Sequence, residues 1–419
     1  MNTGMVRAVY RIETPFPLDH AAAVMAAEQS TGTFIAVPGE SEQLKALHAA
    51  RVLSIETEES AAVPSLPGAS SASAGARFNR GTVTLEFPLV NFGPSIPNLL
   101  ATVAGNLYEL RELSGLRLLD LELPEDFARR YGGPRFGVEG TRRLTGVYGR
   151  PVIGTIVKPS IGLSPEELGE LVGRLCDAGL DFIKDDELNA DPPLASLERK
   201  IQAVMPVIER AADRTGRKVM YAFNITGDIE ELKRRHELVV RHGGTCVMAS
   251  VQSIGLAGMA YLRSFSEVPI HAHRNGWGMM TRHPMLGMSF AAYQKLVRLA
   301  GADHLHVNAL DSKFYESNES VIASVRALRT PLSGTGSCMP VLSSGQSAAT
   351  AETTYRELGT VDLMNIAGGG ILAHPDGASA GVASMHQAWE AALAGVPAAE
   401  YAAGRPELRR ALGTFGRRA

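Results

Sequence analysis

The sequence predicts an α/β protein in two parts: an N-terminal ferredoxin-like α+β domain over residues 1–145, and a C-terminal (β/α)8 barrel over residues 146–419 that ends in a helical extension. The first part follows the order strand, helix, strand, strand, helix, strand. In the second part, eight short apolar runs alternate with amphipathic stretches over the roughly 250 residues that such a barrel needs. These runs are nearly continuously apolar, as parallel strands buried on both faces are.

Hydrophobic periodicity assigns the elements of the N-terminal part, since buried positions repeat every two residues in a strand and every 3.6 in a helix. The predicted strands are Tyr10–Glu13, Val52–Glu56, Thr82–Leu89 and Leu116–Leu123. The predicted helices are Asp19–Gln29 and Ser95–Leu113. Between the second and third strands, Ala61–Ala76 is rich in Ala, Ser, Gly and Pro, which indicates a surface loop.

The eight apolar runs of the second part are the predicted barrel strands. They are Val152–Lys158, Asp181–Glu187, Lys218–Thr226, Cys246–Val251, Val268–Arg274, Asp303–Asn308, Ser337–Gly345 and Val361–Gly370. The clearest helical patterns between them are Pro165–Ala178, Ser196–Thr215, Ile229–His242 and Ser289–Leu299. A doubly wound open sheet is the structural alternative, but that fold usually carries GxGxxG after its first strand, and the motif is missing here.

The composition argues against several functions. The 41 Lys+Arg and 44 Asp+Glu give a formal net charge of −3, which lacks the basic excess of a general nucleic-acid binder. The three cysteines have no CxxC spacing, which argues against a disulfide framework or a zinc cluster and predicts a reducing, cytoplasmic location. No run of about 18 apolar residues occurs and the start lacks a signal-peptide pattern, so we expect no membrane segment.

Polar residues gather at the C-terminal ends of the predicted barrel strands, which meet at one mouth of a (β/α)8 barrel. Nearly all of the strands contribute, so the pattern predicts an active site at this mouth. The residues are Lys158, Lys184, Asp186, Glu187, Asn224, Ser250, Gln252, His273, Arg274, His306, Asn308, Lys313, Ser343, Ser344, Gly345, Gly368, Gly369 and Gly370.

The run Lys184-Asp185-Asp186-Glu187 ends the second barrel strand. Alternate side chains of a strand share a face, so Lys184 and Asp186 are expected to point into the mouth, and Glu187 joins them if the chain turns there. Paired carboxylates favour a hard cation such as Mg2+. If burial lowers the pKa of the lysine, its free amine can add CO2 and become a carbamate, a third oxygen ligand. The alternative is a plain salt-bridged lysine in a loop.

The sequences of two loops predict a phosphate site, because barrels often bind phosphate through backbone N–H groups after strands seven and eight. Here these loops hold Ser344-Gly345 and the glycines 368–370, although a bare triple glycine is more typical of a turn. Arg274 can bind a second anion through its planar guanidinium group. Strands five and six each carry two histidines at alternate positions, and His273 and His306 are nearer the mouth.

Several of these motifs, in this order and over nearly the whole chain, resemble the large subunit of RuBisCO. The resemblance is closer to the RuBisCO-like proteins (form IV), and within them to the 3-oxo-isoapionate-4-phosphate decarboxylase group. The matching segments are Ala27–Phe34, Gly105–Leu107, Gly154–Pro159, Gly179–Glu187, His271–Arg274, Asp303–His306 and Ala367–Gly370.

The resemblance implies a role for each matched residue. A carbamylated Lys184 would bind Mg2+ with Asp186 and Glu187, and Lys158 would be an acid–base lysine. Thr33, Gly368 and Gly369 would hold the phosphate, whereas Arg274, His306 and Ser343 would line the other half of the substrate site. We count His273 and Lys313 among the catalytic residues, and Asn106 and Gly345 among those that bind substrate.

The resemblance also implies a homodimer or a larger homo-oligomer with a shared active site. Residues that match Glu28 and Asn106 reach the barrel of the neighbouring subunit in this family. A phosphorylated keto sugar is the expected partner, and neither nucleic acid nor membrane is.

Because the sequence differs from that of photosynthetic RuBisCO at several motifs, we do not expect this protein to carboxylate ribulose bisphosphate. The K-P-K of the photosynthetic enzyme becomes Lys158-Pro159-Ser160, its tryptophan becomes Phe34, and its S-G-G becomes Ser343-Ser344-Gly345. The surroundings of Lys313 do not resemble its V-G-K, and carboxylation of ribulose bisphosphate needs that loop to close over the gas site.

The resemblance implies that the retained residues form and stabilise an enediolate, with Mg2+ stabilising the negative charge that develops. Our leading hypothesis is decarboxylation of 3-oxo-isoapionate 4-phosphate in apiose catabolism, with a hydrolase or transcarboxylase on the same substrate as a close sibling. The first alternative is a methionine-salvage enolase or isomerase that acts on a methylthio-ketopentose phosphate. The second is a sugar-phosphate binding protein without turnover.

Overall fold

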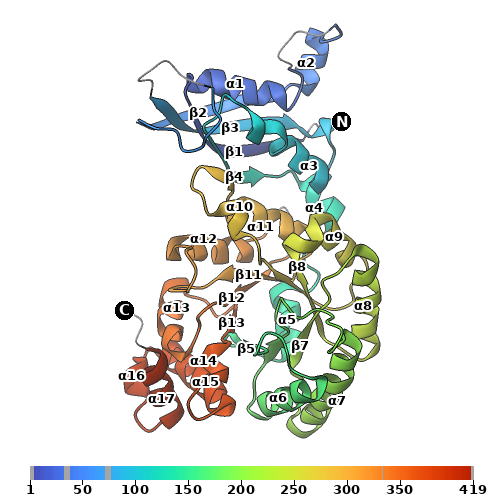
Figure 1. The fold of residues 1–419 in the computed structure, drawn as a ribbon, viewed down its shortest axis with the longest axis vertical. Coiled ribbons are helices and arrows are strands. Elements are labelled where there is room, and N and C mark those ends of the chain that lie inside the picture. Colours follow the sequence, from blue (N-terminus) through green and yellow to red (C-terminus); the bar gives the residue numbers. More distant parts are fainter. Residues whose placement is uncertain (1–3, 33–37, 71–76, 333, 417–419) are drawn as a thin grey trace. The chain divides into compact units, whose positions relative to one another are not determined.

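The computed structural model describes residues 4–32, 38–70, 77–332 and 334–416 (Figure 1). By its internal contacts the chain divides into two compact units. The first comprises the chain up to Gly132 together with Gly276–Leu299 and Leu332–Thr335. The second comprises Gly133–Asn275, Ala300–Pro331 and the chain from Gly336 onward. This division does not coincide with a single cut at residue 145.

A five-stranded sheet forms the first unit, in the order β10-β4-β1-β3-β2. β1 pairs antiparallel with both β3 and β4, and β2 pairs antiparallel with β3. The order β4-β1-β3-β2 is that of a ferredoxin-like fold, so this prediction is confirmed. The elements are β1 (Met5–Thr14), α1 (Leu18–Glu28), α2 (Glu42–His48), β2 (Arg51–Ala61), β3 (Phe78–Pro88), η1 (Leu89–Asn91), α3 (Ile96–Val103), η2 (Asn106–Glu109), β4 (Gly115–Glu122) and α4 (Glu125–Tyr131).

The prediction of one helix over Ser95–Leu113 is wrong. α3 ends at Val103 and the short 3-10 helix η2 follows after a turn at Gly105. A Cβ at Gly105 would lie 2.3 Å from the carbonyl oxygen of Ala101, so a glycine is needed for the chain to turn here.

A segment between two barrel strands also belongs to the first unit. It contains α10 (Gly278–Thr281), β10 (Leu286–Met288) and α11 (Phe290–Leu299). β10 extends the sheet by pairing in parallel with β4. The helix predicted at Ser289–Leu299 therefore exists, but it packs with the N-terminal sheet, where the Lys295 ammonium contacts Asp120 at 2.6 Å.

The second unit is a closed barrel of eight parallel strands, in the order β11-β12-β13-β5-β6-β7-β8-β9. The prediction of a (β/α)8 barrel is confirmed, and the open-sheet alternative is wrong. Its strands are β5 (Val152–Ile156), β6 (Phe182–Lys184), β7 (Met220–Asn224), β8 (Cys246–Ser250), β9 (Ile270–His273), β11 (His304–Asn308), β12 (Met339–Leu342) and β13 (Met364–Ile366). Each of them lies within a predicted strand.

Helices surround this barrel, as the ribbon in Figure 1 shows. They are α5 (Gly137–Thr145), α6 (Pro165–Asp177), α7 (Leu197–Thr215), α8 (Ile229–Arg241), α9 (Val251–Phe265), α12 (Asn318–Arg329), η3 (Ala348–Thr350), α13 (Ala351–Leu358), α14 (Gly369–Leu372), α15 (Ala378–Ala394), α16 (Ala398–Tyr401) and α17 (Pro406–Phe415). None of the described helices is long and apolar enough to cross a membrane.

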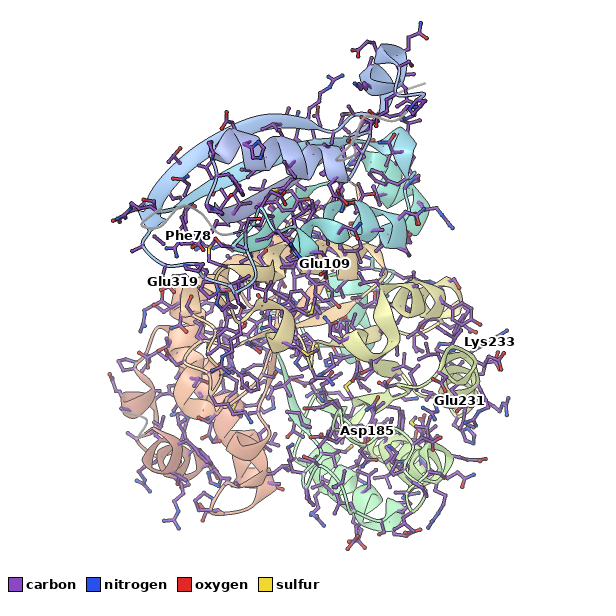
Figure 2. The ribbon with its side chains drawn as sticks, turned by 45° about the horizontal axis from the view of Figure 1, so that its top comes forward. Phe78, Glu109, Asp185, Glu231, Lys233 and Glu319 are labelled. Carbon is purple, nitrogen blue, oxygen red and sulfur yellow. The ribbon has the colours of Figure 1, made fainter. Side chains whose placement is uncertain are left out.

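The helix α8 shows how sequence pattern and position agree. Leu232, His236 and Val239 are buried at helical spacing, whereas Glu231 and Lys233 lie toward the solvent (Figure 2). This apolar stripe is what packs the helix onto the outside of the barrel.

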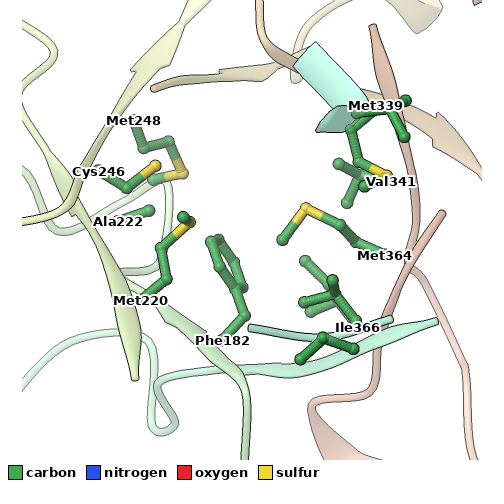
Figure 3. Close-up of a cluster of buried hydrophobic side chains, with 12 residues drawn as sticks. Phe182, Met220, Ala222, Cys246, Met248, Met339, Val341, Met364 and Ile366 are labelled. Atoms are coloured by element: carbon green, nitrogen blue, oxygen red, sulfur yellow. The ribbon is translucent and has the colours of Figure 1, made fainter. Parts of the chain in front are cut away.

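The inside of the barrel is filled by side chains rather than open. Side chains from β6, β7, β8, β12 and β13 point toward one another across it (Figure 3). Phe182 and Met220 are among the largest, at 0% and 1% exposure. Because this layer closes the interior, chemistry is confined to the strand ends.

Candidate active site

The structure brings the charged residues of β5 and β6 together at the C-terminal ends of these strands. The Lys158 Nζ lies 2.6 Å from Asp186 Oδ2 and also donates to Ser160 Oγ at 2.7 Å. The Lys184 Nζ lies 3.8 Å from Glu187 Oε2. Two cations and two carboxylates therefore share one small region.

Lys184 is the most buried of these ionisable groups, with 1% of its side chain exposed. Burial lowers its pKa to about 8, against the opposing effect of the charges on Glu187, Asp186 and Asp185. A substantial fraction of this lysine is therefore a neutral amine in mildly alkaline solution, which is the form that reacts with CO2.

Asp186 remains ionised despite being buried. Burial alone raises the pKa of its carboxyl, but the hydrogen bond from Lys158 and the one from the Leu188 backbone N–H outweigh it, so the net pKa is lowered. An ionised carboxylate at this position is a ready oxygen ligand.

Asp185 points to the opposite side of the strand from its neighbours, as alternation requires. Its carboxylate accepts hydrogen bonds from the Tyr221 hydroxyl at 2.6 Å and from the Asn224 backbone N–H at 2.9 Å. It also pairs with Lys200 at 3.2 Å, and both of these charged side chains are 1% exposed. Lys200 was not singled out from the sequence, because a lysine in an amphipathic helix usually faces solvent.

His273 joins the same cluster, with its Nε2 3.5 Å from Glu187 Oε2. Burial lowers its pKa to about 4, aided by the charge of Lys184 and opposed by that of Glu187. His273 is therefore neutral at pH 7, and its Nδ1 contacts Asn275 Oδ1 at 2.9 Å.

A chain of polar side chains runs along β9 and β11 toward the mouth. Thr141 Oγ1 contacts His304 Nε2 at 2.7 Å, and His304 Nδ1 contacts His271 Nδ1 at 3.3 Å. His271 Nε2 contacts His306 Nε2 at 2.7 Å, and His306 Nδ1 contacts Ser343 Oγ at 2.9 Å.

The hydrogen bond at the Thr141 end of this chain determines which nitrogen of each histidine carries the proton. The Thr141 hydroxyl donates to the carbonyl of Gly137 at 2.5 Å, because a carbonyl can only accept. Thr141 Oγ1 must then accept from His304, which makes His304 the Nε2–H tautomer. It follows that His271 carries its proton on Nδ1, His306 carries its own on Nε2, and Ser343 donates to His306.

Burial supports this assignment, since it lowers the pKa of His304 to about 3 and those of His271 and His306 well below the ordinary value. All three imidazoles are neutral at pH 7, so each has one donor and one acceptor nitrogen. The lone pairs of Ser343 Oγ are left to accept from a bound molecule. His271, His304 and Thr141 add to the predicted residues; alternation of histidines along both strands was the signal for the first two.

Arg274 is paired with a residue that sequence reasoning missed. Its guanidinium group forms an ion pair with Glu316, and their side chains are 9% and 8% exposed. Asn308 Nδ2 donates to the same carboxylate at 2.6 Å. Glu316 lies 42 residues from Arg274, in a segment without clear periodicity, so no sequence pattern connects the two.

The glycine loops also lie at the strand ends. An added Cβ at Gly369 would meet nothing within 4 Å, and one at Gly368 would approach the Cε of Lys158 at 4.0 Å. The backbone is thus open to a ligand beside Lys158. Ser344 adopts φ 80° and Gly345 φ 73°, so Ser344 keeps the left-handed backbone that suits the glycine which the family has there.

Lys313, Asn106 and Thr33 are the remaining predicted site residues. Lys313 is exposed, and its ammonium lies 5.4 Å from the centre of the Phe314 ring. Asn106 belongs to the first unit, where its Nδ2 donates to Glu28 Oε1 at 3.3 Å. Thr33 lies outside the described residues.

The donor set at Lys184, Asp186 and Glu187 fits Mg2+ with a carbamate. Among the described residues, no three His, Cys, Asp or Glu side chains are grouped so as to hold a metal ion. Asp186 and Glu187 offer two carboxylates, and conversion of Lys184 to a carbamate would supply a third oxygen donor. The carboxylates of Asp186 and Glu187 lie beside the ammonium groups of Lys158 and Lys184. A divalent cation would balance the charge of the two carboxylates as these two ammonium groups do.

Comparisons with known proteins identify the family of this chain. Residues 137–415 match the family model of the ribulose bisphosphate carboxylase large chain, catalytic domain, and residues 3–127 match that of its N-terminal domain. The chain belongs to the RuBisCO large-chain family. It is a RuBisCO-like protein, as the sequence motifs predict.

Its relatives in this family are similar over their whole length. The chain is 50% identical to a 3-oxo-isoapionate-4-phosphate transcarboxylase/hydrolase from Xanthobacter autotrophicus, covering 97% of this chain and 98% of the relative. It is 44% identical to a 3-oxo-isoapionate-4-phosphate decarboxylase from Rhizobium etli, covering 98% and 99%. The crystal structure of a RuBisCO-like protein from Burkholderia fungorum superposes with a TM-score of 0.92 at 49% identity, covering 98% and 99%.

Proposed function

We propose that this RuBisCO-like protein is a carbon–carbon lyase that removes the carboxyl group of 3-oxo-isoapionate 4-phosphate and releases it as CO2. The observation that carries the proposal is the convergence of Lys158, Lys184, Asp186 and Glu187 at the ends of β5 and β6. Relatives at 44% and 50% identity carry this substrate in their names.

Lys184 as a carbamate, Asp186 and Glu187 would hold Mg2+ at this site. When bound, the metal would supply positive charge that stabilises a negatively charged oxygen of the substrate. The glycines at 368 and 369 would hold the phosphate through the backbone that they leave accessible.

The reaction needs one bond cleavage and one proton. The substrate is a β-keto acid, so the bond between its carboxylate and the adjacent carbon can break, with the electron pair forming an enediolate as CO2 leaves. The Lys158 ammonium, which contacts Asp186 and Ser160, would return a proton to that carbon. The neutral His273 and the Ser343 oxygen would orient the hydroxyl groups of the substrate.

A transcarboxylase/hydrolase on the same substrate is the second candidate, favoured by the 50% identity to a protein of that name. It also has to break the bond to the carboxyl carbon. The two outcomes differ in the fate of that carbon, which a decarboxylase releases and a transcarboxylase keeps in an organic product.

The test is NMR of 3-oxo-isoapionate 4-phosphate labelled with 13C in its carboxyl group, incubated in D2O with protein, Mg2+ and bicarbonate. We expect enzyme-dependent 13CO2, with one deuterium on the carbon that bore the carboxyl group. Label retained in an organic acid would select the transcarboxylase/hydrolase instead. No change beyond the enzyme-free control rejects both and leads to the methylthio-ketopentose phosphates.

The variant Lys184→Met separates a catalyst from a binding protein. A catalyst loses turnover, because the metal site loses its third donor. A protein that merely binds sugar phosphates keeps its affinity for the substrate, as calorimetry would show.

A further inference from the structure

We propose that Glu316 is a specificity residue: its carboxylate neutralises Arg274, so that this half of the site accepts a neutral polar group and rejects a second phosphate. The inference rests on the proposed function for the location of the substrate site. It deepens that function by naming the residue that would restrict the enzyme to substrates with a single phosphate.

The pair is built into the barrel mouth rather than placed on its surface. Arg274 follows the last residue of β9, and Glu316 lies between β11 and α12. Both side chains are more than nine-tenths buried. A charge-assisted contact at this depth is weakly screened, so the two charges largely cancel for any molecule that binds beside them.

Glu316 is also held from two other sides. Its Oε2 accepts from Asn308 Nδ2 at 2.6 Å, and its Oε1 accepts from the Ser320 hydroxyl at 2.7 Å. Asn308 adopts φ 63°, a left-handed backbone that asparagine tolerates better than most residues. The carboxylate can leave Arg274 only by giving up these contacts as well.

The neighbouring His306 adds no compensating positive charge. His306 is neutral, since burial lowers its pKa and the nearby charge of Arg274 lowers it further. Ser343 donates its proton to His306 and presents its oxygen as an acceptor. A substrate hydroxyl can donate to that oxygen, whereas a phosphate has no proton to offer at pH 7.5 and would meet the Glu316 carboxylate.

The test compares two probes on the full-length protein with Mg2+: ribulose 5-phosphate, with one phosphate, and ribulose 1,5-bisphosphate, with two. Titration calorimetry gives both affinities. We expect the wild type to bind the bisphosphate no more tightly than the monophosphate. In Glu316→Gln, the affinity for the bisphosphate should rise at least about tenfold, since the positive charge of Arg274 is no longer offset by the Glu316 carboxylate. The affinity for the monophosphate should stay within about threefold, because this half of the site contacts a hydroxyl.

The matched control is Glu319→Gln, which removes the same charge three residues away from an exposed position in the first turn of α12 (Figure 2). It should leave the ratio of the two affinities unchanged. The double variant Glu316→Gln with Arg274→Met should not show the increased affinity for the bisphosphate, since that increase depends on the guanidinium group of Arg274.

Two results would overturn the inference. One is a folded Glu316→Gln protein, checked by circular dichroism, whose ratio equals that of the wild type. The other is a wild type that prefers the bisphosphate, a measurement that does not depend on the variant folding. A protein that shows the expected shift but never consumes 3-oxo-isoapionate 4-phosphate would reject the proposed function and leave this inference standing.

Discussion

At the scale of single residues, Lys158 and Lys184 carry the same group in different surroundings. Lys184 is 1% exposed and has a lowered pKa, whereas the Lys158 side chain is 43% exposed and held by Asp186. The buried lysine is suited to become a permanent part of the site, because moving it would leave unpaired charges inside the barrel. The accessible lysine is suited to exchange protons with substrate and solvent.

This contrast predicts the effect of replacing Lys158. In Lys158→Met, kcat should fall about 10²- to 10⁴-fold, the usual contribution of a positioned proton donor. The dissociation constant of the substrate should change far less, since the phosphate contacts remain. Initial rates of CO2 release and calorimetric affinities measure the two effects, with Lys233→Met on the exposed side of α8 as the control. A kcat within threefold of the wild type would show that another group moves the proton.

The buried histidines make stability depend on pH in a predictable direction. The folded pKa of His304 is about 3 and its unfolded pKa is near 6.5. Between pH 6.5 and pH 3, His304 binds a proton in the unfolded chain but not in the folded chain. The free energy of unfolding therefore falls as the pH drops from 6.5 toward 3. This one residue should cost about 2 kcal/mol at pH 5.

The measurement is urea unfolding at pH 7.5 and at pH 5. In His304→Gln, the loss between the two pH values should be about 2 kcal/mol smaller than in the wild type. His20→Gln, which removes an exposed histidine, should leave the loss unchanged. If all three proteins lose the same unfolding free energy between the two pH values, His304 can take up a proton in the folded state as readily as in the unfolded state.

At the scale of elements, helix α7 supports the loop after β6. The Lys200 ammonium pairs with Asp185 and donates to the carbonyls of Asn189 and Ala190 at 2.8 and 2.9 Å. This contact links the buried face of α7 to Asp185, which lies between the expected metal ligands Lys184 and Asp186. The position of Asp186 and Glu187 therefore depends on an element that does not enter the mouth.

The variant Lys200→Met tests this support. It leaves Asp185 buried without its cation, so we expect a loss of about 3–5 kcal/mol in unfolding free energy and weaker Mg2+ binding. Urea unfolding and metal titration measure these. Lys233→Met on the exposed side of α8 (Figure 2) is the control, with an expected change below about 0.5 kcal/mol. Unchanged stability in Lys200→Met would show that water can replace the ammonium.

At the scale of the whole molecule, the family resemblance predicts a homodimer whose active sites are shared between subunits. Glu28 and Asn106 lie together in the first unit, as two residues that serve one neighbouring site would. If each site combines the barrel of one subunit with Asn106 of the other, two inactive variants can complement each other.

Coexpression of Lys184→Ala with Asn106→Ala tests this arrangement. Half of randomly assembled dimers are hybrids, and each hybrid has one intact site, so activity should return to about a quarter of the wild-type value. Each variant alone should be inactive or nearly so. Mass photometry gives the oligomeric state. Absence of recovery in confirmed hybrids would show that each subunit builds its own site.

The sequence by itself determined the architecture. Period-two and apolar runs located all eight barrel strands and the four strands of the split N-terminal order, because burial on one or both faces of a strand leaves a local pattern. It also placed Lys158, Lys184, Asp186 and Glu187 at one mouth, since parallel strand ends converge. It did not reveal α2, which has no buried residue and so no periodicity.

Tertiary structure alone decided which partner each buried charge meets. Arg274 pairs with Glu316, Asp185 with Lys200, and Thr141 sets the protons of a histidine chain that ends at Ser343. The partners come from different elements, and their contact depends on how loops and helices close around the barrel. No local pattern records such a pairing, because the free energy of a buried charge depends on the groups within a few ångströms of it and not on its neighbours along the chain.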